Sequence, residues 1–448
     1  MHVGVIGTGH VGLVTAACLA YVGHDVVGMD DDRRKLDLLA RGEMPFFEPS
    51  LAELTREAQR AGRLVFTCDL DDAVCDKDVA FICVGTPSGS DGGLDLTAVE
   101  AVARRVAASR PREMLLVEKS TVTAQTGARI ERALAVYGGR GMGRVEVASN
   151  PEFLREGSAV HDFLRPDRIV LGVRSDWAEE RLRALYAPLV GDAFRCPTHP
   201  DCSPVPGGSP VMVTNVETAE LIKHASNAFL AAKISFINTV ADVCDRIGAD
   251  VRMVAQAMGL DARIAPSFLQ AGIGYGGSCF PKDVAAFTRF AEEIGIDSSL
   301  LAAVTRMNRA RVDVAVEKLR KTLWILRGKR IGLLGLAFKP HTDDVREAPA
   351  LALATRLRQE GAETVAYDPH ARTTARAAAP DLVIVDDAYQ VAAEADALVL
   401  ATEWPELLSL DWDALKRIMR RPVILDGRNA LDRERLQAAG FEYLGMGR

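Results

Sequence analysis

A cysteine within a glycine-rich segment is the residue whose type and setting most suggest covalent chemistry. Cys279 lies in the segment 272–283, GIGYGGSCFPKD. Pro281 is typical of the first turn of a helix, so a helix is expected to begin just after the cysteine. A thiol at a helix N-terminus beside a lysine, here Lys282, is a better nucleophile than a free thiol. The alternative is a buried structural thiol, the role that we assign to the other seven cysteines.

A second glycine-rich loop, near the start of the chain, has the pattern of a dinucleotide site. Residues 7–12 read GTGHVG, directly after the apolar segment Val3–Ile6 and before an apolar helix. Such glycines permit a tight turn and a close approach to a pyrophosphate, which a helix N-terminus attracts. Asp30 follows roughly 20 residues later, where a carboxylate accepts from the adenosine ribose and repels a 2′-phosphate. The pattern predicts NAD over NADP, although three basic residues at 33–35 oppose that preference, and a glycine turn without a ligand is the alternative.

Two polar residues four positions apart occupy one face of a long predicted helix. Lys223 and Asn227 lie in the segment Val211–Ile247, which contains neither Gly nor Pro. A cation and an amide directed at one cleft could stabilise an oxyanion. A solvated lysine is the alternative. His224 lies off this face and is assigned no role.

These motifs occur in the same order in a known family. The ordered set is the GTGHVG loop, VGTP at 84–87, STV at 120–122, NPEFLREG at 150–157, the Lys223 helix, the Cys279 loop and FKPHTDDVRE at 338–347. The chain resembles the UDP-glucose 6-dehydrogenases over nearly its whole length. The resemblance implies that a nucleotide-sugar primary alcohol is oxidised to a carboxylate with two NAD, through a cysteine thiohemiacetal and a thioester. Covalent capture would keep the aldehyde from escaping between the two oxidations.

The resemblance also implies a role for each matching residue. The implied catalytic residues are the nucleophile Cys279, then Lys223, Asn227 and Asp283 for protons and the oxyanion, and Glu152 with Thr121 for thioester hydrolysis. The implied NAD-binding residues are Gly7, Gly9, Val11, Gly12, Asp30, Lys35, Thr86, Thr121, Glu156, Lys282 and Arg346. The implied residues for the sugar nucleotide are Glu152, Phe153, Leu154, Lys223, Asn227, Arg263, Phe268, Tyr275, Gly276, Phe280, Lys339 and Arg428. By the same resemblance, Arg263 would reach the active site of a second copy.

Two other functions remain open at this stage. A related dehydrogenase could act on UDP-N-acetylmannosamine or GDP-mannose, although the 272–283 loop resembles the UDP-glucose enzymes more closely. A nucleotide-sugar sensor could keep the fold without catalysis, but such a sensor would not need Cys279, Lys223 and Asp283 together. The chain departs from the family at Thr123-Ala124, where Pro-Val is usual. Its segment 196–210 also looks longer than usual, and an exposed loop is the expectation there.

The elements that must position these residues follow from the hydrophobic pattern. Apolar runs of strand length alternate with helical patterns in the first half of the chain and again after about residue 330, which predicts βα units. The expected strands are 3–6, 26–29, 64–67, 79–84, 114–117, 145–148, 169–173, 331–334, 364–367, 382–385, 397–401 and 423–425. We expect an α/β fold in which two Rossmann-like, doubly wound parallel-sheet domains are joined by a helical domain. The expected domains are 1–210 for NAD, 211–326 for the long helix, the dimer contact and the cysteine loop, and 327–448 for the UDP-sugar.

Composition and charge limit the partners. The chain has 448 residues, a formal charge of −7 and a pI of about 5.7, which argues against a nucleic-acid binder. No secretory signal opens it, and its longest apolar run, Val11–Val22, is shorter than the roughly 20 residues of a membrane span. We therefore expect a cytoplasmic protein without membrane contact. Cys196, His199 and Cys202 lack a nearby fourth ligand, so no metal site is expected.

The long helix also predicts assembly. A helix from about Val216 to Ile247 is longer than one core requires. Its stripe of Ile234, Ile237 and Ala241 is expected to pack against a second copy. A homodimer or a higher homo-oligomer is the expected state.

Overall fold

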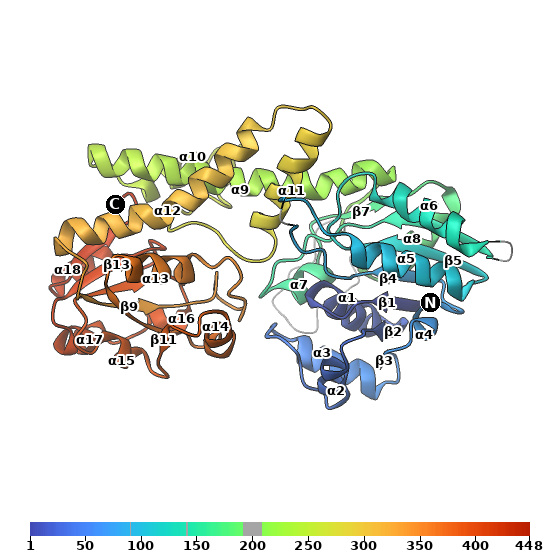
Figure 1. Ribbon diagram of the computed structural model, residues 1–448, viewed down its shortest axis with the longest axis horizontal. Helices are drawn as coiled ribbons and strands as arrows, with labels where there is room; N and C mark the ends of the chain where they lie inside the picture. Colours follow the sequence, from blue (N-terminus) through green and yellow to red (C-terminus); the bar gives the residue numbers. More distant parts are fainter. Residues whose placement is uncertain (90, 140–141, 191–207) are drawn as a thin grey trace. The chain divides into compact units, whose positions relative to one another are not determined.

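The fold comes from a computed structural model, which describes residues 1–89, 91–139, 142–190 and 208–448. The chain divides into two compact units, Met1–Ser226 and Asn227–Arg448, and the division falls within helix α9 (Val216–Ile247). Figure 1 follows the chain through both units. Cys196, His199 and Cys202 lie outside the described residues.

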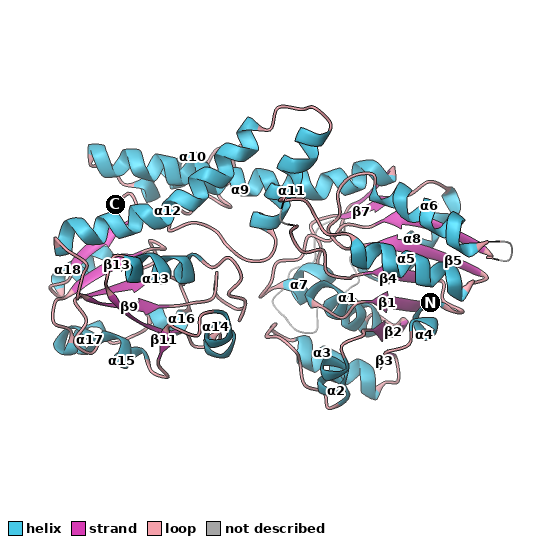
Figure 2. Ribbon diagram, in the orientation of Figure 1, coloured by secondary structure: helices cyan, strands magenta, loops and turns pink. Residues whose placement is uncertain are grey.

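An eight-stranded sheet forms the centre of the first unit, in the order β3-β2-β1-β4-β5-β6-β7-β8 (Figure 2). The strands are β1 (His2–Ile6), β2 (Asp25–Met29), β3 (Leu64–Thr67), β4 (Val79–Ile82), β5 (Glu113–Glu118), β6 (Arg144–Ser149), β7 (Ile169–Gly172) and β8 (Val211–Thr214). Neighbouring strands are parallel except β6 and β7, which meet antiparallel. The strand order reverses at β1 and β4, and ligands of such sheets bind at the carboxyl ends beside this switch point.

Helices pack on both faces of this sheet. They are α1 (His10–Tyr21), α2 (Arg33–Ala40), α3 (Leu51–Arg60), α4 (Leu70–Val74), α5 (Thr97–Ser109), α6 (Thr126–Gly138), α7 (Ala159–Leu164) and α8 (Asp176–Tyr186), followed by a 3-10 turn at Ala187–Leu189. One buried cluster joins the sheet to α1, α3, α7 and α8, and another joins it to α4, α5 and α6. The two clusters arise because alternate side chains of a strand point to opposite faces of the sheet. Both faces are therefore apolar.

The second unit contains a six-stranded, fully parallel sheet in the order β11-β10-β9-β12-β13-β14. Its strands are β9 (Arg330–Leu334), β10 (Glu363–Tyr367), β11 (Val383–Ile384), β12 (Ala397–Leu400), β13 (Val423–Asp426) and β14 (Glu442–Gly445). Its helices are α10 (Val251–Gly259), α11 (Phe280–Glu293), α12 (Ser299–Leu323), α13 (Pro349–Gln359), α14 (Arg372–Ala378), α15 (Ala388–Ala392), α16 (Pro405–Leu408), α17 (Trp412–Ile418) and α18 (Arg433–Ala438). The predicted α/β class, with two parallel-sheet domains and helical sequence between them, is confirmed.

Helix α9 has the predicted extent, but the predicted stripe lies on its buried side. The helix spans 32 residues. Ile237 and Ala241 are fully buried in a cluster with Val251 and Leu269 of the same chain. The expectation that these two residues face a second copy is therefore wrong. The large apolar side chains that α9 exposes are Leu221, Phe229, Phe236, Val243 and Ile247.

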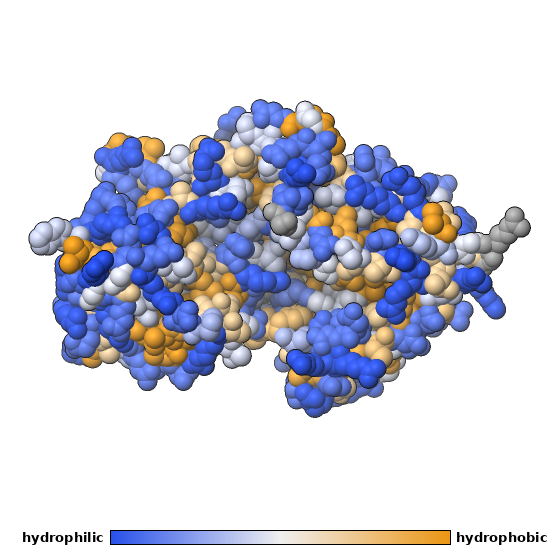
Figure 3. All heavy atoms as spheres, in the orientation of Figure 1, coloured by the Kyte–Doolittle hydropathy of each residue, from blue (hydrophilic) through white to orange (hydrophobic). Residues whose placement is uncertain are grey.

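The surface carries both polar and apolar side chains. On the face drawn in Figure 3, hydrophobic residues occur in small patches among hydrophilic ones. Among the described residues, no helix combines the length and apolar character needed to cross a bilayer. Cys18, Cys83 and Cys244 are buried thiols as expected, whereas Cys75 is only partly buried and Cys68 is exposed, which corrects the expectation for these two residues.

Candidate active site

The first glycine loop connects β1 to α1 and leaves room for a ligand at the helix N-terminus. Gly7 has a φ of +93°, and a Cβ there would lie 2.7 Å from the carbonyl oxygen of Cys83. A Cβ on Gly12 would lie 1.8 Å from the carbonyl oxygen of Gly7, so helix and loop pack too closely for any side chain. Gly9 is the N-cap of α1, and a Cβ there would meet nothing within 4 Å. This open N-terminus fits a pyrophosphate.

Asp30, at the end of β2, ties the glycine loop to the sheet. Its Oδ2 accepts from Thr8 N at 2.7 Å, Thr8 Oγ1 at 2.8 Å and Lys35 Nζ at 2.7 Å. Burial alone would raise the pKa of Asp30, but the Lys35 ammonium and the hydrogen bonds hold it below its usual value. Among the described residues, its Oδ1 accepts a hydrogen bond from Asp32 N alone and so keeps acceptor capacity. The charge of Lys35 is paired with Asp30, which weakens its attraction for a 2′-phosphate.

Two loops at the carboxyl ends of β4 and β5 are joined by threonines of the predicted site. Thr86 Oγ1 donates to the carbonyl oxygen of Thr121 at 2.8 Å. Helix α9 supports the second loop, because His224 Nε2 lies 2.7 Å from the carbonyl oxygen of Val122. Glu220 also accepts two backbone N–H groups at the start of α6. His224 and Glu220 therefore have positioning roles that the sequence pattern did not reveal.

A buried ion pair joins the NPEF segment to α9. Lys223 Nζ lies 2.6 Å from Glu152 Oε1, and both side chains are buried. Glu152 Oε2 accepts from Leu154 N at 2.6 Å. Burial alone would raise the pKa of Glu152, but the Lys223 ammonium and the hydrogen bonds hold it below its usual value. A carboxylate and an ammonium in direct contact can exchange a proton with a bound substrate. The ring of Phe153 lies 5.8 Å from Lys223 Nζ.

In the second unit, the cysteine loop has the predicted geometry. Helix α11 begins at Phe280, Cys279 is its N-cap and a proline lies in its first turn. The Asn308 side chain binds both backbone groups of Tyr275, each at 2.9 Å. A Cβ on Gly276 would lie 2.1 Å from the carbonyl oxygen of Glu347. The loop is therefore shaped by close backbone packing that excludes side chains.

An amide and a carboxylate meet one turn into α11. Asn227 Nδ2 donates to Asp283 Oδ2 at 2.6 Å, and Asp283 is fully buried. The backbone N–H of Asp283 donates to the Cys279 carbonyl oxygen at 2.8 Å. Lys282 Nζ lies 3.8 Å from Asp283 Oδ1. Asp283 therefore links Asn227, and through it α9, to the turn that carries the thiol.

Arg428 acts as a clamp on the cysteine loop. Its guanidinium donates to the carbonyl oxygens of Ala401, Gly274 and Phe338 at 2.7, 3.0 and 2.8 Å. The ring of Phe280 lies 5.8 Å from that of Tyr275 and 6.0 Å from that of Phe268. Lys339 Nζ lies over the Phe338 ring at 5.3 Å. Except for Arg263, the residues implied for the sugar nucleotide in this unit thus gather around one loop.

Two predicted arginines lie on the surface. The side chain of Arg263 is 88% exposed and pairs with Asp261 at 2.6 Å. The side chain of Arg346 is 63% exposed and pairs with Asp344 at 2.7 Å. Within this chain the structure does not bring Arg263 to the thiol.

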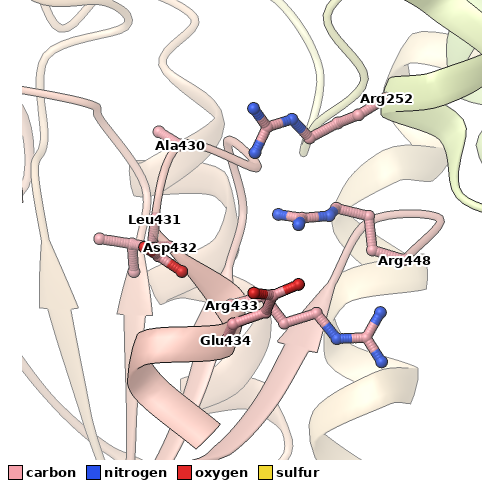
Figure 4. A pocket seen from close by; sticks show the side chains of 7 residues that line it. All are labelled: Arg252, Ala430, Leu431, Asp432, Arg433, Glu434 and Arg448. Carbon is pink, nitrogen blue, oxygen red and sulfur yellow. The ribbon is translucent and has the colours of Figure 1, made fainter. Parts of the chain in front are cut away.

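A cavity of about 340 Å³ lies elsewhere in the second unit (Figure 4). It is lined by Arg252, Ala430, Leu431, Asp432, Arg433, Glu434 and Arg448, none of which belongs to the predicted site. The guanidinium groups of Arg252 and Arg448 extend into it, and the carboxylate of Glu434 lies nearby. Charges of both signs therefore line this cavity. Separately, no cluster of His, Cys, Asp and Glu in the described part of the chain could hold a metal ion.

Comparison with known families gives the chain its class. The chain matches three family models of the UDP-glucose/GDP-mannose dehydrogenase family: the NAD binding domain at residues 1–190, the central domain at 217–310 and the UDP binding domain at 332–433. A glycine loop open to a pyrophosphate and a buried acid–base pair are the parts that an NAD-dependent oxidoreductase needs. The chain belongs to the UDP-glucose/GDP-mannose dehydrogenase family.

Individual relatives cover the whole chain. It is 44% identical to the UDP-glucose 6-dehydrogenase of Rhizobium meliloti, over 100% of both chains. It is 43% identical to that of Pseudomonas aeruginosa, over 100% of this chain and 98% of the relative. Among solved structures, the UDP-glucose dehydrogenase of Pyrobaculum islandicum is 39% identical with a TM-score of 0.89, over 100% and 97% of the two chains. The UDP-D-ManNAc dehydrogenase of Pyrococcus horikoshii is 29% identical with a TM-score of 0.85, over 100% and 99%.

Proposed function

We propose that this protein oxidises UDP-glucose at C6 to UDP-glucuronate with NAD, in two successive oxidations. One observation carries the proposal: a cysteine at a helix N-terminus accompanies the NAD-type glycine loop. A single-step alcohol dehydrogenase has no need of such a thiol. The full-length relatives named above as UDP-glucose 6-dehydrogenases support the choice of sugar.

NAD, when bound, accepts the hydrides that leave the sugar C6. The glycine loop of residues 7–12 would hold its pyrophosphate, and Asp30 Oδ1 would accept from its ribose. The joined loops of Thr86 and Thr121 lie at the carboxyl ends of β4 and β5, where such sheets bind ligands. Residues 1–210 would form this NAD-binding part, 211–326 the catalytic and assembly part, and 327–448 the UDP-sugar part.

The chain's own residues would handle covalent capture. The Cys279 thiolate adds to the C6 aldehyde carbonyl, and a C–S bond forms while the carbonyl oxygen becomes an oxyanion. Lys223 and Asn227, one turn apart on α9, would stabilise that oxyanion. A proton delivered to it completes the thiohemiacetal.

Loss of a second hydride to NAD, together with the hydroxyl proton, turns the thiohemiacetal into a thioester, which water must cleave. The Glu152 carboxylate would accept a proton as water attacks the carbonyl carbon, with Thr121 positioning that water. The tetrahedral intermediate then collapses, the C–S bond breaks and Cys279 leaves as thiolate. Asp283, held by Asn227, would keep the reacting turn in place.

Two alternatives are weaker. A relative acting on UDP-D-ManNAc shares 29% identity with this chain, against 39% for the solved UDP-glucose dehydrogenase. Burying the Glu152–Lys223 ion pair costs desolvation free energy. A sensor without catalysis would gain nothing in return for that cost.

The test is NADH release against a panel of UDP- and GDP-sugars. UDP-glucose should give two NADH and one UDP-glucuronate per sugar, with no free aldehyde. One NADH per sugar, or a clear preference for another nucleotide sugar, would overturn the proposal.

The proposal includes a homo-oligomer that acts in the cytoplasm. Phe229, Phe236 and Val243 recur at seven-residue spacing on the exposed side of α9, with Ile247 one turn further on. Such a stripe suits packing against the same helix of a second copy. Arg263, exposed in this chain, would then be available to the partner's site. Light scattering should show a dimer or larger assembly that Phe236→Glu disrupts and Val136→Glu, on α6, does not; a monomer with full activity would contradict this.

A further inference from the structure

The side chain of Lys119 is a cation buried in the first unit. It follows β5 directly, is 4% exposed, and its Nζ lies 5.8 Å from the Phe81 ring and 5.9 Å from the Phe163 ring. Nζ donates to Asn150 Oδ1 at 2.9 Å and lies 3.4 Å from the Asn150 carbonyl oxygen. In the described part of the chain, this ammonium forms no ion pair with a carboxylate.

The acceptor of this ammonium is itself fixed. Asn150 Nδ2 donates to the carbonyl oxygen of Val170 on β7 at 2.9 Å. Asn150 Oδ1 also accepts from Tyr186 OH at 2.5 Å, and its backbone N–H donates to the Glu118 carbonyl oxygen at 2.9 Å. The amide therefore joins β5, β7 and α8 to the segment that follows β6.

The two loops that Lys119 connects are those of thioester hydrolysis. Lys119 lies two residues before Thr121, and Asn150 lies two residues before Glu152. We infer that Lys119 is a positioning residue that locks these two loops together, so that Glu152 and Thr121 meet the attacking water in the correct geometry. This inference rests on the proposed function, because it assigns the two loops their roles in hydrolysis.

Burying a lysine at this position lowers the stability of the fold, which argues for a functional reason to keep it. Burial lowers the pKa of Lys119 to about 8, so the charged form is destabilised at neutral pH. An apolar residue of similar length would fill the space between the Phe81 and Phe163 rings without that cost, and such replacements often stabilise a protein. The charge does, however, attract the Glu152 carboxylate and help to keep it ionised. Sites that retain a destabilising residue commonly do so for activity.

The experiment uses the full-length enzyme and Lys119→Met. In the first turnover, the variant should form two NADH per active site at nearly the wild-type rate. Later turnovers should slow by about 100-fold, the cost expected for a misplaced catalytic group. Mass spectrometry should find the acyl group on Cys279, while the melting temperature stays the same or rises. Lys119→Arg, which keeps the cation, should recover part of the rate.

Matched variants separate the possible outcomes. Lys77→Met makes the same change at a lysine that donates to the nearby carbonyl oxygen of Cys75, and it should leave every rate unchanged. If Lys119→Met does not fold, Asn150→Ala removes the acceptor instead and should also accumulate the acyl-enzyme. Equal slowing of the first and later turnovers, without an adduct, would overturn the inference. Failure of the wild type to form two NADH from UDP-glucose would instead refute the proposed function.

Discussion

The predicted site residues of the two units are held in place by different interactions. In the first unit, ion pairs hold them: the partly buried pair of Asp30 with Lys35 and the buried pair of Glu152 with Lys223. In the second unit, the Cys279 loop is held by backbone carbonyls, glycines and the Arg428 clamp. The first arrangement should respond to changes of charge and pH. The second should respond to changes of volume.

The largest effect is expected from the nucleophile itself. Cys279→Ala should bind UDP-glucose and NAD normally, because the loops that hold them are unchanged, but it should lose turnover by several powers of ten. Removal of a covalent nucleophile deletes a route and not merely a contact. NADH formation and product analysis measure this. Two NADH per sugar at near-normal rate would show that the thiol is structural. Cys279→Ser should trap an ester that is detectable by mass, because alkoxide is the poorer leaving group.

A charge removed from the first unit should alter the pH dependence of stability. The pKa of Lys119 is about 8 in the folded protein and about 10.4 in an unfolded chain, so the unfolded state binds more protons between these values. The contribution of Lys119 therefore becomes more favourable as the pH rises from about 8 to about 10, by up to roughly 3 kcal/mol. The Lys119→Met variant lacks this pH-dependent contribution to the free energy of unfolding.

Chemical denaturation of the wild type and of Lys119→Met across that pH range gives the difference between their free energies of unfolding, which measures this contribution. Lys119→Met should be the more stable protein at pH 7, and its advantage should shrink towards pH 10. Groups far from Lys119 titrate alike in both proteins, so they cancel from this difference. A constant difference across the range would mean that Lys119 does not titrate there.

A volume change in the second unit should disturb the cysteine loop. Gly276→Ala places a Cβ 2.1 Å from the Glu347 carbonyl oxygen, so the loop must move, and kcat should fall about 100-fold with little change in NAD affinity. In the first unit, the Cβ added by Gly9→Ala would contact no protein atom, so stability should be unchanged. The same Cβ should weaken NAD binding. Kinetics and NAD titration of the two variants test the contrast, and a harmless Gly276→Ala would contradict it.

The smallest effect concerns cofactor choice. Asp30→Ala should weaken NAD binding by about 10-fold and reduce the enzyme's preference for NAD over NADP. The substitution removes the group that accepts from the ribose and leaves the Lys35 charge available to a 2′-phosphate. The ratio of kcat/KM with NAD to kcat/KM with NADP measures this preference. Similar kcat/KM values for the two cofactors in the wild type would contradict the assigned role of Asp30.

The sequence by itself determined the features that depend on local pattern. The glycine loop, the proline-marked helix after Cys279 and the span of α9 all follow from residue types at fixed spacing, and the structure confirms them. The alternating apolar runs likewise predicted most of the strands. Periodicity does not record direction, however, so the antiparallel contact of β6 with β7 was not predicted.

Only the tertiary structure decided which side chains meet across long distances in the sequence. Periodicity could not tell which apolar face of α9 is buried, because Ile237 and Phe236 are both apolar, yet the first is buried and the second is exposed. Nor could it show that Lys223 pairs with Glu152, or that Lys119 is sealed between two aromatic rings. Such pairings arise when separate strands end at one edge of a sheet, and there burial sets the charge and the reactivity of each group.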